Sequence, residues 1–281
     1  MRNYTLGIDG GGSKTHAILM DSNKKIIAEF ITGPANIKTD LSLALHSIST
    51  AINTILSQNH LSQFEVTIVV GVAGFSATQN LEILQSKLQK LYVNITIISD
   101  CHLACLAAHG GNDGAILICG TGVVGYYIQN GIGKQIGGWG FPHGDIGGGA
   151  WIGLEICKFL CMAIDGSIEF SSILETLFQR FENNVDNYKT WLLKATPQNY
   201  AEIAKLLPNF ILANDPYALE ILTNGSNAIT VFLNAITNKT GDLPIKISGG
   251  LAKIYFRFLG QKFLTLEISN ESSAIGAYNV K

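Results

Sequence analysis

Short apolar runs and longer amphipathic stretches alternate along the first part of the chain. Apolar, β-branched runs predict strands over residues 4–8, 15–20, 26–31, 66–73 and 95–98. Helices are predicted between and after these strands, over residues 41–56, 79–91 and 101–109. This order of elements indicates an α/β layer whose parallel strands are covered by helices.

A strand, a glycine turn and a strand begin the second part of the chain, as they begin the first. Residues 115–119 predict a strand, Gly120-Thr121-Gly122 a turn, and residues 123–128 a second strand that closes at Asn130-Gly131. The run from Gly120 to Gly125 satisfies G-x-G-x-x-G, but no helix follows it to receive a dinucleotide pyrophosphate. We therefore reject a dinucleotide-binding motif there.

The rest of the chain is predicted to be mostly helical before it returns to strands. Residues 150–239 make up this helical part, with prolines at helix starts or breaks. The last predicted elements are a strand over 243–247, a helix after Ser248-Gly249-Gly250, a strand over 263–268 and a helix over 272–280. We expect two α/β layers, the second with a large helical insertion, and a ligand site in the cleft between them.

The turn after the first strand carries the first candidate chemistry. Asp9 ends the strand and Gly10, Gly11 and Gly12 follow it. Such a turn can bring backbone N–H groups close to a polyphosphate while the carboxylate faces the associated metal. A P-loop needs glycine where Ser13 stands, and a Rossmann motif needs a helix where residues 16–20 predict a strand. A phosphate-binding hairpin is the functional interpretation, and an ordinary glycine-rich hairpin is the structural alternative.

Phosphoryl transfer also needs a base that positions the attacking oxygen. Asp100 stands between a predicted strand and a predicted helix, where a carboxylate can act as this base. The structural alternative is a helix N-cap, and both roles can hold together.

The segment from Gly137 to Ala150 is the densest in candidate ligand contacts. Its seven glycines flank Trp139, His143 and Asp145 and exclude a regular element. Asp145 can accept hydrogen bonds from vicinal hydroxyls, and Trp139 offers an apolar wall. His143 is better interpreted as a hydrogen-bonded loop histidine than as a ligand or base. Asn36, in a short Gly-Pro-Ala-Asn turn, is either a turn former or a side chain that reads hydroxyls.

Composition narrows the classes of function. A chain of 281 residues is long enough for two domains, and a net charge of −2 gives no basic surface for nucleic acid. No apolar run reaches the roughly 18 residues of a membrane span, and the chain starts without a signal-peptide pattern. We expect a cytoplasmic protein. Its five cysteines include two C-x-x-x-C pairs, but they lie in apolar stretches and are better interpreted as buried thiols than as metal ligands.

These motifs resemble a known superfamily. Asp9 to Thr15, the Gly120-Thr121-Gly122 hairpin and Ser248-Gly249-Gly250 are similar to the three nucleotide motifs of the sugar kinase/Hsp70/actin superfamily. A narrower resemblance, to the BadF/BadG/BcrA/BcrD-type N-acetylglucosamine and glucosamine kinases, runs nearly end to end. The segments that carry it are Gly33-Pro34-Ala35-Asn36, Ser99-Asp100, Ala104 to His109, Gly138-Trp139-Gly140, Gly144-Asp145 and Asp215-Pro216.

The resemblance implies an α/β fold of two ribonuclease-H-like, actin-like ATPase domains with an interdomain cleft and a helical insertion in the second. It implies an N-terminal domain over residues 1–109, completed by a C-terminal helix at 270–281, and a nucleotide-binding domain over 110–269. It also implies that the protein uses ATP and Mg²⁺ to phosphorylate the 6-hydroxyl of an amino sugar, glucosamine or N-acetylglucosamine. A homodimer is compatible with it.

The resemblance also assigns roles to residues. Asp100 would accept the proton of the sugar 6-hydroxyl, and Asp9 would hold Mg²⁺ largely through water. The ATP contacts would be Asp9, Gly11, Gly12, Ser13, Lys14, Thr15, Gly120, Thr121, Gly122, Gly249 and Gly250. The sugar contacts would be Asn36, Ser76, Asp100, Trp139, Gly140 and Asp145.

Two departures and two alternatives remain at this point. Ile146 and a run of glycines follow Asp145, where many relatives have an acidic residue and a serine. Trp139 resembles the N-acetylglucosamine enzymes, whereas much of the rest resembles the glucosamine enzymes. One alternative is an ATP-driven, iron–sulfur activator of a 2-hydroxyacyl-CoA dehydratase, whose cluster would need Cys101, Cys105, Cys157 and Cys161. The other is a sugar-sensing regulator, although no DNA-binding segment precedes the first strand.

Overall fold

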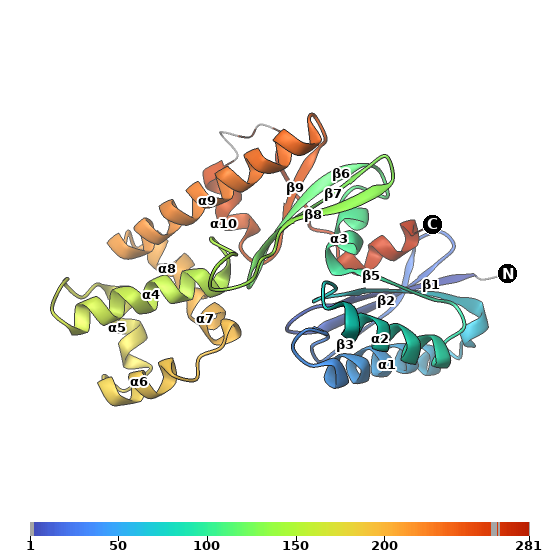
Figure 1. Ribbon diagram of the computed structural model, residues 1–281, viewed down its shortest axis with the longest axis horizontal. Coiled ribbons are helices and arrows are strands. Elements are labelled where there is room, and N and C mark those ends of the chain that lie inside the picture. The colour runs from blue at the N-terminus through green and yellow to red at the C-terminus, as the bar shows by residue number, and fades with distance from the viewer. Residues whose placement is uncertain (1–2, 260–262, 264, 281) are drawn as a thin grey trace. The chain divides into compact units, whose positions relative to one another are not determined.

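The chain folds into two compact units. The computed structural model describes residues 3–259, 263 and 265–280 (Figure 1). Unit 1 consists of Met1–Ile116, Tyr126–Lys134 and Asn270–Lys281, and unit 2 consists of Leu117–Gly125 and Gln135–Ser269. The domain boundary between residues 109 and 110 stays a prediction.

Unit 1 contains a five-stranded mixed sheet in the order β3-β2-β1-β4-β5. Its strands are β1 (Tyr4–Gly10), β2 (Thr15–Asp21), β3 (Ile26–Thr32), β4 (Val66–Val72) and β5 (Ile95–Ser99). The first three strands form an antiparallel meander, and β4 and β5 add to β1 in parallel. The predicted strands, their order along the chain and the α/β class are confirmed.

Helices cover both faces of this first sheet (Figure 1). They are α1 (Leu41–Gln58), α2 (Thr78–Leu91) and α3 (Asp100–Ala108), with the 3₁₀ turns η1 (Gln63–Glu65) and η2 (Ser273–Asn279). The α1 face holds Leu6, Ile8, Ile48 and Ile52 in the core, and the other face packs α3 and η2. Successive strand residues point to opposite faces of the sheet. Because helices cover both faces, both sets of side chains are apolar.

The second five-stranded sheet has the order β10-β9-β6-β7-β8. Its strands are β6 (Gly114–Cys119), β7 (Val123–Gln129), β8 (Ile132–Gly137), β9 (Ile245–Ser248) and β10 (Glu267–Ile268). The helical insertion consists of α4 (Gly149–Ile164), α5 (Ser172–Gln179), α6 (Val185–Leu192), α7 (Pro197–Ala204), α8 (Leu207–Leu212) and α9 (Pro216–Thr240). The helix predicted after Ser248-Gly249-Gly250 is α10 (Ala252–Leu259).

Three details differ from the expectation. β8 was not expected, although Asn130 and Gly131, with φ of 54° and 73°, make the kind of two-residue turn that joins hairpin strands. The strand expected over 263–268 is formed only by Glu267–Ile268, and residue 264 lies outside the described residues. The closing element is a 3₁₀ helix, and a Cβ on its Gly276 would collide with the carbonyl of Leu103 on α3.

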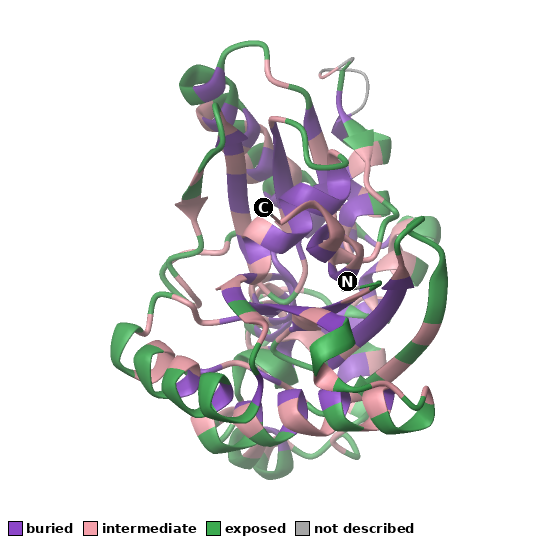
Figure 2. Ribbon diagram, turned by 90° about the vertical axis from the view of Figure 1, so that its right-hand side faces the viewer, coloured by how far each residue is buried: buried purple, intermediate pink, exposed green. Residues whose placement is uncertain are grey.

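Each unit has its own buried core. Figure 2 shows the inner strands mostly buried and the outer sides of the helices exposed, and the strands β3 and β8 have no buried residue. In unit 2 the core gathers around α4 with Ile156, Leu160, Leu177 and Tyr188. Within the described part of the chain, no helix is both long and apolar enough to cross a membrane.

Candidate functional site

The carboxyl ends of β1, β4 and β5 lie at one edge of the first sheet. In the parallel register Asp9 is opposite Gly71, and Val72 is opposite Ser99, so Asp100 follows β5 at the level where β1 ends. The two predicted carboxylates therefore belong to the same edge. This is the edge at which open α/β sheets bind ligands.

The glycine turn after Asp9 is a hairpin, as predicted. Asp9 pairs with His16 and Gly10 with Thr15, and the Gly11 N–H donates to the Lys14 carbonyl across 3.0 Å. Thr15 is buried, and its hydroxyl donates to the Gly33 carbonyl across 2.8 Å. This bond attaches the hairpin to the turn that carries Asn36. Ser13 and Lys14 are exposed at the tip.

Asp9 is held in an environment that disfavours its charge. Burial raises its pKa, and a hydrogen bond from the Ser273 side chain and the charges of His16 and Lys14 act in the opposite direction. Ser273 begins η2, so the C-terminal segment supplies a direct partner to this carboxylate. No local pattern predicts this contact, because Asp9 and Ser273 are 264 positions apart in the chain.

Asp100 is not the N-cap of α3. Ser99 is the cap, and its hydroxyl accepts from the His102 N–H at 3.1 Å. Asp100 Oδ1 accepts from the Cys101 N–H at 2.8 Å. Burial, and secondarily the charge of Asp9, raise the pKa of Asp100 to about 6. Two neighbouring acids with raised pKa values are typical of a catalytic site.

Gly71 places α3 against the sheet at this point. A Cβ on Gly71 would lie 2.9 Å from Leu103 Cβ and 3.3 Å from Asp100 Cα. Any side chain there would push the start of α3 away from β4. Gly71 thus sets the distance between Asp100 and the strand ends.

Asn36 and Ser76 lie on the loops beside the same edge. Asn36 forms an isolated parallel bridge with Ala73, and its Oδ1 accepts from the Lys38 N–H at 3.0 Å. Asn36 is therefore a turn former, as one of the two interpretations held, and this hydrogen bond fixes the position of its side-chain amide. Ser76 is exposed in the loop after β4.

In unit 2 the Gly120-Thr121-Gly122 turn joins β6 to β7 and contacts the start of α4. The N–H groups of Gly149 and Ala150 donate to the carbonyls of Gly120 and Thr121 across 2.8 and 2.9 Å. A Cβ on Gly148 would lie 2.8 Å from the Thr121 carbonyl oxygen. The glycine run after Asp145 is explained by this close packing.

Asp145 lies against the same turn. Its φ is 62°, and a Cβ on Gly122 would collide with its carboxylate. Gly249, with φ of 95°, packs on the carbonyl of Cys119 in the same way. Unit 2 therefore brings three predicted segments together at the end of β6, namely 120–122, Asp145 and 249–250.

At three of the glycines predicted to contact the phosphates or the adenosine, neighbouring atoms would leave room for a larger residue. No heavy atom lies within 4 Å of a Cβ built on Gly12, Gly120 or Gly250, and none of them has a positive φ. Open space over a backbone that needs no special conformation fits the close approach of a ligand. The backbone at these three positions is therefore open to a ligand.

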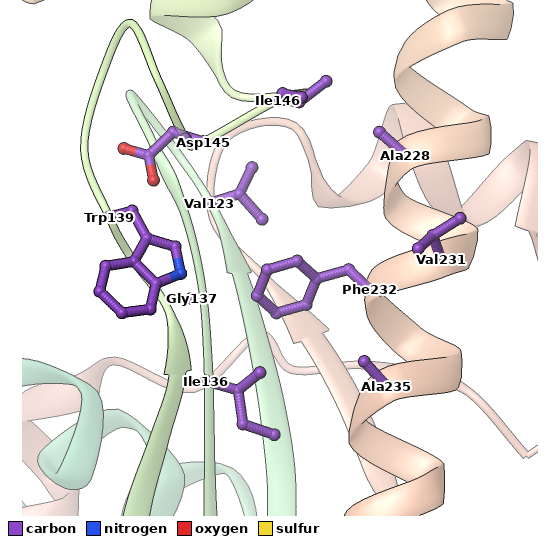
Figure 3. A pocket seen from close by; sticks show the side chains of 11 residues that line it. Val123, Ile136, Gly137, Trp139, Asp145, Ile146, Ala228, Val231, Phe232 and Ala235 are labelled. Atoms are coloured by element: carbon purple, nitrogen blue, oxygen red, sulfur yellow. The ribbon is translucent and has the colours of Figure 1, made fainter.

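Trp139 exposes 85% of its surface at the edge of a cavity of about 430 Å³ in unit 2. Figure 3 shows Trp139 and Asp145 on one side and residues of α9 on the other. The lining residues are Val123, Ile136, Gly137, Trp139, Gly144, Asp145, Ile146, Ala228, Val231, Phe232 and Ala235. Gly140, predicted beside Trp139, has φ of 92° and open space over its Cα.

Comparison with known proteins agrees with this geometry. The sequence matches the BadF/BadG/BcrA/BcrD ATPase family over residues 6–277. The chain belongs to this family. The resemblance inferred from the motifs is confirmed.

Relatives in the family carry related names. The glucosamine kinase of Vibrio cholerae is 32% identical over 89% of this chain and 86% of its own length. The N-acetyl-D-glucosamine kinase of Dictyostelium discoideum is 25% identical over 87% and 84%. The solved structure of a candidate N-acetylglucosamine kinase from Chromobacterium violaceum is 25% identical, covers 98% of both chains and superposes with a TM-score of 0.90. This likeness confirms the two-domain α/β fold class.

The dehydratase-activator alternative is less supported. Of the four cysteines that this alternative needs, Cys101, Cys105 and Cys157 are buried, and burial raises the pKa of these three thiols, whereas Cys161 is half-buried. Cluster ligands are thiolates, which these surroundings disfavour. Among residues 3–259, 263 and 265–280, no group of three or more His, Cys, Asp or Glu side chains could hold a metal ion.

Proposed function

We propose that the protein is an ATP-dependent amino-sugar kinase that phosphorylates the 6-hydroxyl of glucosamine or N-acetylglucosamine. The observation that carries the proposal is Asp100, a carboxylate at the strand-end edge with a raised pKa and with helix capping left to Ser99. Family membership and the names of the relatives agree with it.

ATP would be held by the two glycine turns and by Gly249-Gly250. The open backbone at Gly12 and Gly120 suits phosphate oxygens, and Gly250 suits the adenosine. Asp9 would hold Mg²⁺ largely through water, as a carboxylate at the end of β1 beside the first turn. Bound Mg²⁺ supplies charge neutralisation on the phosphates.

Asp100 acts as the general base. It accepts the proton of the sugar 6-hydroxyl as that oxygen attacks the γ-phosphorus and the bond to the β-phosphate oxygen breaks. With a pKa of about 6, Asp100 is mostly charged at neutral pH, and it is a stronger base than an ordinary aspartate. Asn36, Ser76, Trp139, Gly140 and Asp145 would orient the sugar, which makes the reaction of bound groups effectively unimolecular.

The test is sugar-dependent ADP formation with Mg²⁺. Purified protein is incubated with ATP and either amino sugar, ADP is measured in a coupled assay, and the phosphorylated carbon is identified by ³¹P and ¹H NMR. We expect a 6-phosphate. ADP release that does not depend on any hexosamine would overturn the proposal. A cytoplasmic location and a homodimer are part of the same proposal, and light scattering tests the homodimer.

A further inference from the structure

The turn that carries Asp145 has a constrained backbone. Asp145 and Gly147 have φ of 62° and 89°, and this left-handed region is uncommon for a residue with a side chain, such as Asp145. The Gly148 N–H donates to the Asp145 carbonyl across 2.9 Å and closes the turn. A backbone of this kind persists only where the surrounding structure holds it. The contacts of the turn therefore decide where the Asp145 carboxylate lies.

Tyr255 of α10 supplies one of these contacts from inside the core of unit 2. Its hydroxyl donates to the Gly147 carbonyl across 2.5 Å. Tyr255 exposes only 1% of its surface, and burial raises the pKa of its hydroxyl, so the group remains a proton donor. Gly147 is buried as well, so removal of the hydroxyl would take this partner from a carbonyl oxygen that lies away from water.

Two glycines leave room for this hydroxyl. A Cβ on Gly147 would lie 3.1 Å from the Tyr255 hydroxyl oxygen, and a Cβ on Gly225 of α9 would lie 2.6 Å from it. A larger residue at either position would displace the hydroxyl or the turn. The hydrogen bond between Tyr255 and Gly147 therefore depends on glycine at both positions.

The helix that carries Tyr255 also begins at the proposed nucleotide site. α10 starts just after Gly249-Gly250, and the Leu251 N–H donates to the Cys119 carbonyl across 3.1 Å, next to the Gly120 turn. One helical turn further on, the Tyr255 N–H donates to the Leu251 carbonyl. The position of Tyr255 is thus fixed by the same backbone that carries the proposed adenosine contacts.

We propose that Tyr255 is a positioning residue for the sugar, which holds the Asp145 turn through the Gly147 carbonyl so that the Asp145 carboxylate can accept hydrogen bonds from the sugar hydroxyls. The inference rests on the proposed kinase activity and adds to it a residue that acts through Asp145. Tyr255 affects the affinity for the sugar rather than the proton transfer, because Asp145 binds hydroxyls that do not react and holds them equally in the substrate and in the transition state.

The first experiment compares Tyr255→Phe with Tyr188→Phe. Tyr188 is the matched control, because it also exposes 1% of its surface and donates its hydroxyl to a carbonyl of unit 2, that of Cys157, across 3.0 Å. Both variants should unfold at lower urea concentrations than the parent protein, since each loses one buried hydrogen bond. Only Tyr255→Phe should raise KM for the amino sugar, by about 10-fold, with kcat and KM for ATP within about twofold of the parent. Equal sugar KM values in the two variants would overturn the inference.

A double substitution tests whether the effect passes through Asp145. Asp145→Asn alone should raise the sugar KM at least as much as Tyr255→Phe does, because it removes the carboxylate itself. In protein that already carries Asp145→Asn, the further change Tyr255→Phe should raise the sugar KM by less than about twofold, since no carboxylate is left to position. A further rise of about 10-fold would show an effect independent of Asp145 and would contradict the proposal.

Gly225→Ala displaces the same hydroxyl without removing it. The new Cβ would force the Tyr255 hydroxyl away from the Gly147 carbonyl, while alanine favours the helical conformation of α9. The sugar KM should rise and the KM for ATP should stay at the parent value. This variant decides the question if Tyr255→Phe does not fold, and an unchanged sugar KM in Gly225→Ala would refute the role of Tyr255.

The outcomes distinguish this inference from the proposed function. If the parent protein phosphorylates no amino sugar, the kinase proposal fails and the inference fails with it. If the parent is active and Tyr255→Phe has the same sugar KM as Tyr188→Phe, the kinase proposal stands and the inference alone fails.

Discussion

Replacing Asp100 by asparagine should make the protein more stable and nearly inactive at the same time. Asparagine has the same shape, and its Oδ1 can still accept from the Cys101 N–H. What is lost is the negative charge and the ability to take a proton. Active sites that hold charges in unfavourable surroundings show this opposition between stability and activity.

The size of the stability gain follows from the pKa. Burial, and secondarily the charge of Asp9, raise the pKa of Asp100 from 3.8 to about 6. Each pKa unit corresponds to about 1.4 kcal/mol, so keeping this carboxylate charged in the fold costs about 3 kcal/mol at most. The side chain is only partly buried, and solvent reduces the cost to about 1–2 kcal/mol.

The direction in which the stability changes with pH follows from the difference in proton binding between the folded and unfolded states. The folded state binds the Asp100 proton more tightly than the unfolded state, so the native protein loses stability as pH rises from about 4 to about 6. Asp100→Asn removes this loss. We expect a gain of about 1–2 kcal/mol at pH 7.5 and almost none at pH 4.

The assay combines urea unfolding at pH 7.5 and pH 4 with kcat measured by ADP release. We expect kcat of Asp100→Asn to fall by at least ~100-fold, the usual contribution of a general base. Asp242→Asn, at an exposed position, is the control and should change stability by less than about 0.5 kcal/mol. A variant that is no more stable at pH 7.5, or a kcat within tenfold of the parent, would refute the reasoning.

Three further outcomes follow from the site. Gly120→Ala should unfold at the same urea concentration as the parent protein, because no heavy atom lies within 4 Å of the new Cβ. The same variant should bind ATP at least ~10-fold more weakly, measured by calorimetry. An unchanged affinity for ATP would show that Gly120 does not contact the phosphates. Ser273→Ala should weaken Mg²⁺–ATP binding by roughly fivefold, since the charged form of Asp9 loses a hydrogen bond. The control is Ser272→Ala, because the Ser272 hydroxyl contacts His16, and it should change the affinity less than twofold. Equal effects of the two substitutions would contradict the hydrogen bond between Ser273 and Asp9. The kcat/KM of the parent enzyme should rise with pH around 6 and level off above 7 as Asp100 loses its proton, and a profile flat down to pH 5 would argue against this base.

Much of the fold was predictable because its signals are local. The Asp9 hairpin follows from an apolar strand, three glycines and a second apolar strand within one short segment. The junction at Asp100 follows from a β-branched run that meets a helical segment. Residues that act within a few positions of one another leave their pattern in the sequence.

The parts of the site that the sequence did not predict depend on distant contacts. The role of Gly71 depends on its contact with α3, and nothing in the sequence around Gly71 distinguishes it from another strand glycine. Phe232 is one of many apolar residues of α9, and it lines the cavity only because α9 packs beside β7 and β8. Asp100 was the only residue weighed as the helix cap, whereas the structure makes Ser99 the cap; serine and aspartate are both good caps, and only the backbone geometry separates them.

The three-part composition of unit 1 has a consequence for synthesis on the ribosome. Its hydrophobic sheet is translated early, but η2, which packs against α3 and β1 and brings Ser273 to Asp9, is translated only after the whole of unit 2. The nascent chain therefore carries a sheet face that only α3 covers, without η2, while more than half of the residues are still to be added. Such surfaces are aggregation-prone, which makes this the stage at which a chaperone would matter most.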